Sequence, residues 1–289
     1  MRSKLFVPGS RPELFAKALK SAADALSFDL EDAVEEGAKP AAREHLSTLL
    51  QGPVEALNDK LVVVRVNAVG TSHFASDLEA VAWPTLHVVN LPMVEDPEVV
   101  RHAAQALATL EKTRGLTQPI RLLVNIESPR GLRRAAELAC ADPRVVGLQI
   151  GFGDLFSPLG IVSGEASATQ FVRVAVRLAA GEAGIDAYDG AYVNFSDPAG
   201  YRSDSELSQC LGFAGRSCIH PSQVALANEV FQPSKADIAH SVRVVEAARE
   251  NLARGVGAFT VDGRLVDGPF ITRAEKIVKL ASRLGLLAP

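Results

Sequence analysis

The sequence predicts an α/β fold, a (β/α)8 TIM barrel that carries a C-terminal helical and lid extension. Three observations predict it. The 289 residues fit one barrel of about 250 residues followed by a tail. Eight short apolar runs recur along the chain, and Ala-rich amphipathic segments separate them. Acidic side chains gather where several of these runs end, which is the side on which a parallel barrel has its functional residues.

The apolar runs predict the strands. Each is rich in Val, Ile, Leu or Phe and lacks strict alternation, as expected for parallel strands covered on both faces. We expect the eight strands within residues 4–9, 25–32, 61–68, 86–93, 120–127, 145–154, 191–195 and 216–221.

The segments between the runs predict helices. Pro12 stands at a first helical position, and Asp96-Pro97 and Ser128-Pro129 each pair an N-cap residue with a first-turn proline. An open doubly wound sheet is the alternative to a barrel, but it usually has a Gly-rich dinucleotide loop after its first strand. Residues 6–13 hold a single glycine there, and the barrel is therefore favoured.

The chain beyond the eighth strand predicts a separate extension. We expect a barrel domain over residues 1–232 and a helix and lid over residues 233–289. Residues 235–253 form an amphipathic pattern, Asp262-Gly263 predict a hairpin turn, and a last helix is expected from about Arg273. This tail exceeds what a barrel needs and is a candidate lid or oligomer contact.

The composition excludes several classes of protein. A net charge of −4 with mixed signs gives no basic patch for nucleic acid. No apolar run approaches the roughly 20 residues that cross a bilayer, and the N-terminus is too polar for a signal peptide. Three scattered cysteines indicate neither disulfides nor zinc, so we expect a cytoplasmic protein. The chain has no Walker A loop, G-x-S-x-G elbow, or metal-binding histidine spacing.

Two carboxylates stand out at the ends of neighbouring strands. Glu127 ends the fifth run immediately before Ser128-Pro129, and Asp154 ends the sixth run in a Gly-flanked turn. Clustered carboxylates raise one another's pKa and need a cation nearby, and Mg²⁺ takes such oxygen ligands. The alternative is that each acid only offsets the dipole of the helix that it precedes.

Other polar residues at the strand ends also have two interpretations. Arg65 either neutralises a neighbouring acid or holds a substrate carboxylate with its planar guanidinium. Glu31 and Asp32 either hold water and support the site or form ordinary ion pairs. His220 ends the eighth run, where a single histidine is commonly structural.

Seven motifs together resemble the citrate lyase beta-subunit group of the HpcH/HpaI aldolase family, which includes malyl-CoA and citramalyl-CoA lyases. They occur in the same order from about residue 2 to residue 280, so the resemblance covers nearly the whole chain. The motifs are LFVPGSRPELFAKA, DLEDAV, VRVN, IESPRG, GDL, CIHPSQ and VDGRLVDGP.

The resemblance implies a magnesium-dependent C–C lyase acting on a small 3-hydroxy-dicarboxylyl thioester, with a 2-oxoacid and an acyl-CoA as products. It implies that Glu127 and Asp154 bind Mg²⁺ and that Arg65 holds the 2-oxoacid. It also implies that Asp267, on a lid that reaches a neighbouring subunit, moves a proton at the enolate carbon, and that the protein is a homotrimer or a higher homo-oligomer. The remaining implied contacts to coenzyme A or the oxoacid fall on Phe6, Arg11, Lys17, Gly153, Ile219 and His220.

Three departures from the family pattern leave the substrate open. Met93 stands where many relatives have lysine, Gly153 where a carboxylate is frequent, and Asn194 where an aspartate is common. Two other functions remain as alternatives: a class II aldolase for a free 4-hydroxy-2-oxoacid, and a non-catalytic subunit that binds CoA or an acyl carrier protein. The acyl chain, the stereochemistry, the pathway and any later thioester hydrolysis are not predicted.

Overall fold

The structure is a computed structural model and describes residues 1–57 and 59–287. The chain forms two compact units, Met1–Phe231 and Gln232–Pro289. No helix among the described residues has the length and apolar character needed to span a membrane.

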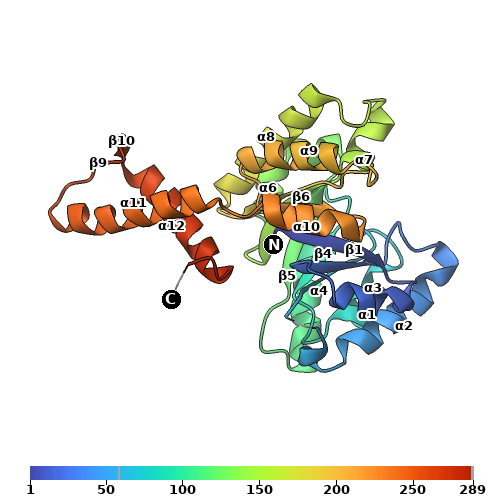
Figure 1. Cartoon of the computed structure of the whole chain (residues 1–289). Helices are drawn as coiled ribbons and strands as arrows, with labels where there is room; N and C mark the ends of the chain where they lie inside the picture. Colours follow the sequence, from blue (N-terminus) through green and yellow to red (C-terminus); the bar gives the residue numbers. More distant parts are fainter. Residues whose placement is uncertain (58, 288–289) are drawn as a thin grey trace. The chain divides into compact units, whose positions relative to one another are not determined.

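The first unit is the predicted barrel. Eight strands pair in chain order, and the eighth pairs with the first, which closes the sheet (Figure 1). Every pairing in the barrel is parallel. The strands are β1 Ser3–Pro8, β2 Ala25–Asp29, β3 Leu61–Arg65, β4 Val88–Leu91, β5 Arg121–Ile126, β6 Val145–Ile150, β7 Asp186–Asp189 and β8 Gly215–Cys218.

The prediction of the seventh strand was wrong. The sequence predicted it in the apolar run 191–195, but β7 lies a few residues earlier and reads Asp-Ala-Tyr-Asp. Val193 and Phe195 are exposed in a loop. Asp189 is fully buried because Arg173 pairs with it at 2.8 Å, and this ion pair makes an acidic residue compatible with a buried strand. Asn194 therefore does not end a strand.

Helices connect the strands and cover the outside of the barrel. Ser128 and Asp96 cap their helices as predicted, and their side chains accept the backbone N–H groups of Gly131 and Glu98. The α-helices of this unit are α1 Phe15–Leu19, α2 Lys39–Leu50, α3 Phe74–Val81, α4 Pro97–Arg114, α5 Pro129–Arg133, α6 Ala135–Ala139, α7 Phe152–Phe156, α8 Ala166–Glu182, α9 Pro198–Cys210 and α10 Pro221–Val230. The 3-10 helices are η1 Pro12–Leu14, η2 Glu36–Ala38, η3 Val54–Leu57 and η4 Ser157–Leu159.

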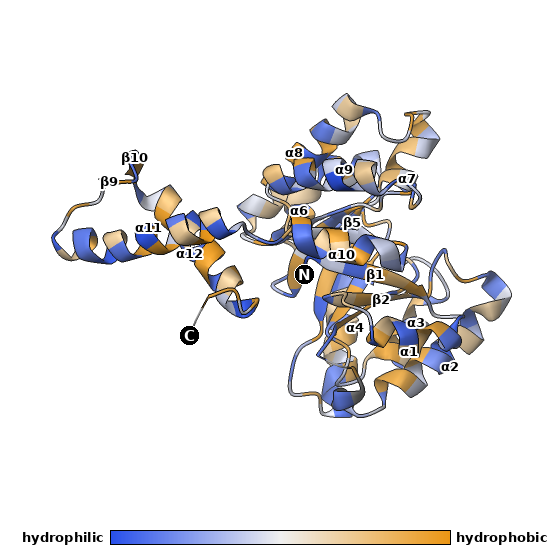
Figure 2. Ribbon diagram, viewed as in Figure 1, coloured by the Kyte–Doolittle hydropathy of each residue, from blue (hydrophilic) through white to orange (hydrophobic). Residues whose placement is uncertain are grey.

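Two apolar clusters hold this unit together. The larger lies between the strands and the helices, and includes Leu26, Val64 and Leu107. Figure 2 shows that the surrounding helices carry hydrophilic as well as hydrophobic residues, as expected for helices with one covered face. The smaller cluster lies inside the barrel and consists of Ala25, Val63, Val88, Leu123 and Tyr188. Burial of these faces leaves the strand ends to carry the polar residues.

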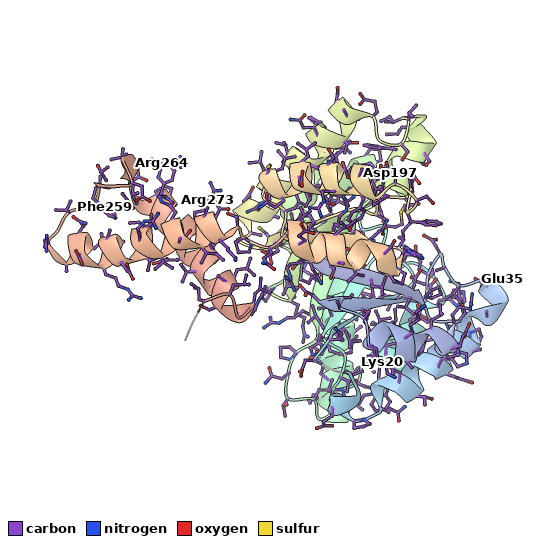
Figure 3. The ribbon with its side chains drawn as sticks, in the orientation of Figure 1. Lys20, Glu35, Asp197, Phe259, Arg264 and Arg273 are labelled. Carbon is purple, nitrogen blue, oxygen red and sulfur yellow. The ribbon has the colours of Figure 1, made fainter. Side chains whose placement is uncertain are left out.

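The second unit is a helical hairpin with a short two-stranded sheet. It contains α11 Lys235–Ala253, the antiparallel strands β9 Phe259–Val261 and β10 Arg264–Val266, and α12 Gly268–Arg283. Phe259, Arg264 and Arg273 mark the two strands and the last helix in Figure 3. Asp262 and Gly263 have φ of 51° and 74°, which confirms the predicted hairpin turn.

The start of the last helix differs from the prediction. α12 begins at Gly268, before Arg273, because Pro269 fits a first-turn position and the chain leaves extended geometry after Asp267. α11 and α12 pack through Val244, Ala248 and Ile271 together with the sheet residues Val261 and Val266.

Candidate active site

A cavity of about 760 Å³ opens where the barrel strands end. Asp29 and Arg65 end β2 and β3, Glu127 directly follows β5, and Asp154 lies four residues beyond β6; all four line the cavity. Parallel strands bring these positions to one end of the barrel. The carboxylates that the sequence places far apart therefore face a common space.

Glu127 is held rigidly at the edge of this cavity. It is buried, and its Oε1 accepts the backbone N–H of Met93 at 2.5 Å while its Oε2 accepts Asn125 Nδ2 at 3.2 Å. Met93 has a φ of 51°, a left-handed conformation that turns its N–H toward the carboxylate. A Cβ at Gly151 would lie 2.7 Å from Glu127 Cβ, so glycine is required there.

Glu127 forms no ion pair with a residue that the structure describes. Burial raises its pKa to about 7 and the negative charge of Asp154 adds to the rise, while the Met93 N–H and the charge of Arg65 oppose it. Among the residues that the structure describes, no lysine, arginine or histidine forms an ion pair with it. The carboxylate is thus placed where a positive charge from outside the chain would stabilise it.

Asp154 belongs to the first turns of α7 and is exposed to the cavity. It makes no hydrogen bond or ion pair with a described residue, so its oxygens are available. The part of the chain that the structure describes contains no cluster of three or more histidine, cysteine or acidic ligands. Two carboxylates with open space beside them fit Mg²⁺, which keeps waters and substrate oxygens as its other ligands.

Arg65 is already engaged with acids. Its Nε and Nη2 form a fork onto Asp29 at 2.7 and 2.6 Å, and Nη1 lies 2.5 Å from Glu31 and 3.3 Å from Asp32. The interpretation of Arg65 as a partner of the neighbouring acids is therefore confirmed. Its substrate role stays a prediction, and Nη1 is the atom on its outer side.

Glu31 and Asp32 differ in their surroundings. Asp32 lines the cavity and is exposed, whereas Glu31 is mostly covered. Burial raises the pKa of Glu31 to about 8 because Arg65 offsets the cost only in part and Asp32 adds a like charge. One guanidinium thus serves three acids, and this side of the cavity has an excess of negative charge.

Three of the predicted substrate contacts line the cavity, namely Phe6, Gly153 and Ile219. The ring of Phe6 lies 5.4 Å from the Arg65 guanidinium, and a Cβ at Gly153 would meet no neighbour. Ile219 is 41% exposed, which leaves an apolar side chain open to a ligand. These positions agree with a substrate role, which stays a prediction.

The other predicted contacts lie outside the cavity. Arg11 is exposed and pairs with Glu13, and Lys17 is exposed on α1. His220 caps α10: its Nδ1 accepts the backbone N–H of Ser222, and its ring stacks on Phe195. The histidine therefore has the structural role that the sequence left open, and its ligand role stays a prediction.

Asp267 belongs to the second unit, where it precedes α12. Its Oδ1 is buried and has no hydrogen-bond partner among the described residues. The neighbouring Asp262, by contrast, pairs with His240 and Arg243 of α11. The role of Asp267 as a proton donor or acceptor stays a prediction.

Sequence reasoning missed several polar residues around the cavity. Asp29 positions Arg65, Asn125 donates to Glu127, and Gln149 and Ser217 line the cavity deeper inside the barrel. The sequence does contain a pattern that could have identified Asn125, Gln149 and Ser217. Residues i and i+2 of a strand share a face, and each of these three residues stands two positions before a residue that lines the cavity, as Asn125 does before Glu127.

Comparisons with known proteins place the chain in a family. Residues 2–221 match the family model for HpcH/HpaI aldolase/citrate lyase. The chain is 36% identical to the citrate lyase subunit beta of Escherichia coli strain K12, over 99% of this chain and 94% of that protein. It is 35% identical to the L-malyl-CoA/beta-methylmalyl-CoA lyase of Cereibacter sphaeroides strain ATCC 17025, over 98% of this chain and 95% of that enzyme.

Two solved structures of relatives support the same family assignment. Protein CitE of Mycobacterium tuberculosis, in complex with magnesium, acetoacetate and coenzyme A, matches with a TM-score of 0.76 and 35% identity over 98% of this chain and 100% of that chain. A citrate lyase beta subunit from the same organism, complexed with oxaloacetate and magnesium, matches with a TM-score of 0.68 and 35% identity over 80% of this chain and 97% of that chain. The chain belongs to the HpcH/HpaI aldolase/citrate lyase family.

Proposed function

We propose that this protein is a magnesium-dependent C–C lyase. It cleaves or forms a small 3-hydroxy-dicarboxylyl thioester of the malyl-, citramalyl- or citryl-CoA type, with a 2-oxoacid and an acyl-CoA on the other side of the reaction. One observation carries the proposal: Glu127 and Asp154 face the same cavity, and neither has a cationic partner among the described residues. The lyases and the magnesium and CoA complexes among the relatives support the same chemistry.

Glu127 and Asp154 would hold the metal ion, which when bound supplies a Lewis acid for the carbonyl oxygen of the 2-oxoacid. Asn125 and the Met93 N–H fix the direction of the Glu127 carboxylate, and this limits the reorganisation needed when the ion binds. Gly151 keeps the space beside Glu127 free of a side chain.

Arg65 supplies a fixed positive charge at the cavity wall. Asp29 holds two of its nitrogens, so Nη1 is the atom that turns to the carboxylate of the oxoacid. Glu31 and Asp32 share Nη1 in this structure, and substrate takes over part of that contact while a water joins the displaced acid. The rigid pairing with Asp29 makes the guanidinium a preorganised electrostatic group.

The thioester end of the substrate is assigned to Phe6, Arg11, Lys17, Ile219 and His220. Phe6 and Ile219 offer apolar contact inside the cavity, and the exposed cations of Arg11 and Lys17 suit the phosphates of coenzyme A. Arg11 must leave Glu13 to do so, an exchange between exposed partners that costs little.

Asp267 completes the proposal as the group that moves a proton at the enolate carbon. It comes from the second unit of a neighbouring copy in a homotrimer or higher homo-oligomer, and the protein acts in the cytoplasm. The buried Oδ1 of Asp267, which has no partner among the described residues, supports an acid–base role, because a carboxylate used only for structure is normally hydrogen-bonded.

A panel of substrates tests the function. The protein is incubated with Mg²⁺ and malyl-, citramalyl- or citryl-CoA, and the 2-oxoacid released is measured. We expect turnover that a chelator abolishes, and a loss of at least about 1,000-fold in kcat/KM for Asp154→Ala. Glu98→Ala removes an exposed acid of α4 and is the matched control, for which no change is expected.

A second measurement distinguishes the thioester lyase from the main alternative, an aldolase for free 4-hydroxy-2-oxoacids. Arg11 and Lys17 do not line the cavity, an observation that favours an aldolase for free 4-hydroxy-2-oxoacids. We expect the double variant Arg11→Ala, Lys17→Ala to raise KM for the thioester about tenfold or more. An unchanged KM, or cleavage of the free acid at a higher kcat/KM than any thioester, would replace the lyase proposal by that alternative.

A further inference from the structure

One layer of the barrel interior, just below the carboxylates, is polar. Bulky branched side chains usually fill a barrel of this kind. Here six buried polar residues from six strands occupy the layer instead, namely Lys4, Ser27, Asn90, Asn125, Gln149 and Ser217. The layer beneath them is the apolar cluster that contains Val63 and Leu123, so the polarity is confined to the side that faces the cavity.

Half of the polar layer is explained by Glu127. Lys4 Nζ donates to Asn90 Oδ1 at 3.3 Å, Asn90 Nδ2 donates to Asn125 Oδ1 at 2.7 Å, and Asn125 Nδ2 donates to Glu127 Oε2 at 3.2 Å. The ammonium form of Lys4 can only donate and the ionised carboxylate of Glu127 can only accept, so in these charge states the two ends fix the direction of both amides. These residues orient a proposed metal ligand.

The other half has no such explanation. Gln149 Oε1, Ser217 Oγ and Ser27 Oγ are buried and have no hydrogen-bond partner among the described residues. Gln149 and Ser217 are 4% and 2% exposed, and both line the cavity, whereas Ser27 does not. Buried polar groups are normally paired, so the two cavity-lining side chains are suited to bind a polar group of a ligand.

The available donors define what that ligand group is. Ser217 has a hydroxyl, Gln149 can present its amide N–H₂ by rotation, and Lys4 is the register neighbour of Ser217 in the pairing of β1 with β8. Lys4 forms no ion pair with a described residue, and burial followed by the charge of Arg65 holds its pKa well below the ordinary value. An arriving anion would favour the charged form of Lys4. A carboxylate, which only accepts hydrogen bonds, satisfies this donor set.

We propose that Gln149 and Ser217, with Lys4 behind them, form a subsite for a second carboxylate of the 2-oxoacid. The subsite belongs to the cavity that Glu127 and Asp154 also line, and in the proposed complex it receives the substituent on the oxoacid's reacting carbon. The protein therefore selects a dicarboxylic 2-oxoacid over pyruvate or glyoxylate, whose methyl group or hydrogen would leave the polar atoms unpaired. This inference rests on the proposed function and specifies its substrate class.

Binding measurements test the subsite without any turnover. Isothermal titration calorimetry with Mg²⁺ present compares freshly prepared oxaloacetate with pyruvate and glyoxylate. We expect the wild-type protein to bind oxaloacetate at least about tenfold more tightly than pyruvate. In Gln149→Met and Ser217→Ala, the oxaloacetate-to-pyruvate affinity ratio falls about tenfold, and the thermal transition confirms that each variant is folded.

Ser27→Ala is the matched control. It removes an equally buried and unpartnered hydroxyl of the same layer that does not line the cavity, so the affinity ratio stays at the wild-type value. Equal wild-type affinity for oxaloacetate and pyruvate, or a ratio that Gln149→Met and Ser217→Ala leave unchanged, overturns the subsite while the lyase proposal stands. Binding of none of the three oxoacids in the presence of Mg²⁺ overturns the proposed function, and the subsite with it.

Discussion

Two charged clusters in the barrel unit use the same residue types in opposite ways. The mouth cluster, at the cavity, consists of Arg65 with Asp29, Glu31 and Asp32, so that one cation faces three carboxyl groups. The outer cluster lies between the strands and the helices and has two of each charge. Its members are Arg173 of α8, Asp189 of β7, Asp204 of α9 and Arg216 of β8.

The pKa values of the acids follow this difference. Burial alone would raise the pKa of Asp204, but the hydrogen bond from Arg173 and the charges of Arg216 and Arg173 outweigh it, and the pKa is lowered. At the mouth, burial raises the pKa of Glu31 to about 8 and Arg65 is insufficient to offset it. In the outer cluster the charges balance within the fold, whereas the mouth cluster keeps more carboxyl groups than cations.

The largest change in stability is expected when the outer cluster is disrupted. Arg173→Leu leaves Asp189 buried with only the more distant Arg216, 3.8 Å away, and we expect the free energy of unfolding to fall by about 3–5 kcal/mol. Urea denaturation at pH 7 measures it. Arg202→Leu removes an arginine whose partners are exposed and serves as the control, with a change below about 1 kcal/mol. Equal losses in the two variants would show that the outer cluster is not what holds α8 to the barrel.

The next prediction concerns Glu127 in the cavity, where a substitution is expected to increase the free energy of unfolding. The folded pKa of Glu127, about 7, exceeds its ordinary value of 4.5. Between these values the folded state binds more protons than the unfolded state, so the contribution of Glu127 to stability is lost as the pH rises. Without Mg²⁺, Glu127→Gln should therefore be more stable than the wild type at pH 8 by about 1–3 kcal/mol, and not at pH 4.5.

The same urea titrations include Mg²⁺ as a second condition. The ion should stabilise the wild type at pH 8 and leave Glu127→Gln unchanged, because binding to the folded state alone adds to the free energy of unfolding. A variant less stable than the wild type at pH 8 would mean that the Met93 and Asn125 hydrogen bonds outweigh burial at Glu127. In that event the carboxylate would be a structural group.

The sequence predicted the barrel because six of its strands are apolar runs that need no distant partner to be recognised, and β8 overlaps the start of the run 216–221. The seventh strand was missed because Asp189 is acceptable in a buried strand only beside Arg173, which lies 16 residues away in the chain. The sequence prediction placed the start of α12 too late, although Pro269 fits the first turn of a helix and Ile271 is already buried there. Charge pairing across the fold, unlike periodicity, leaves no local pattern to read.

The candidate site also has residues that the sequence predicts and contacts that it does not. Glu127 and Asp154 could be predicted from their places after two neighbouring strands. The contact from Met93 could not, because it depends on a left-handed backbone at a residue that is not glycine. The pairing of Asp29 with Arg65 follows from their register as neighbours on β2 and β3, which the sequence does not give.

The smallest expected effect is a change in the pKa of Glu31 within the mouth cluster. Asp32 is 66% exposed, so solvent screens its charge, and Asp32→Asn should lower the pKa of Glu31 from about 8 by about one unit or less. A carbon-13 NMR titration of the Glu31 carboxyl measures the change, and Asp197→Asn, at the start of α9, provides a control with no change. Because burial is the larger cause of the raised pKa, most of the shift should remain in Asp32→Asn. A pKa that does not fall at all would mean that burial alone sets it, and then the excess of acids over arginine at the mouth would have no electrostatic consequence for Glu31.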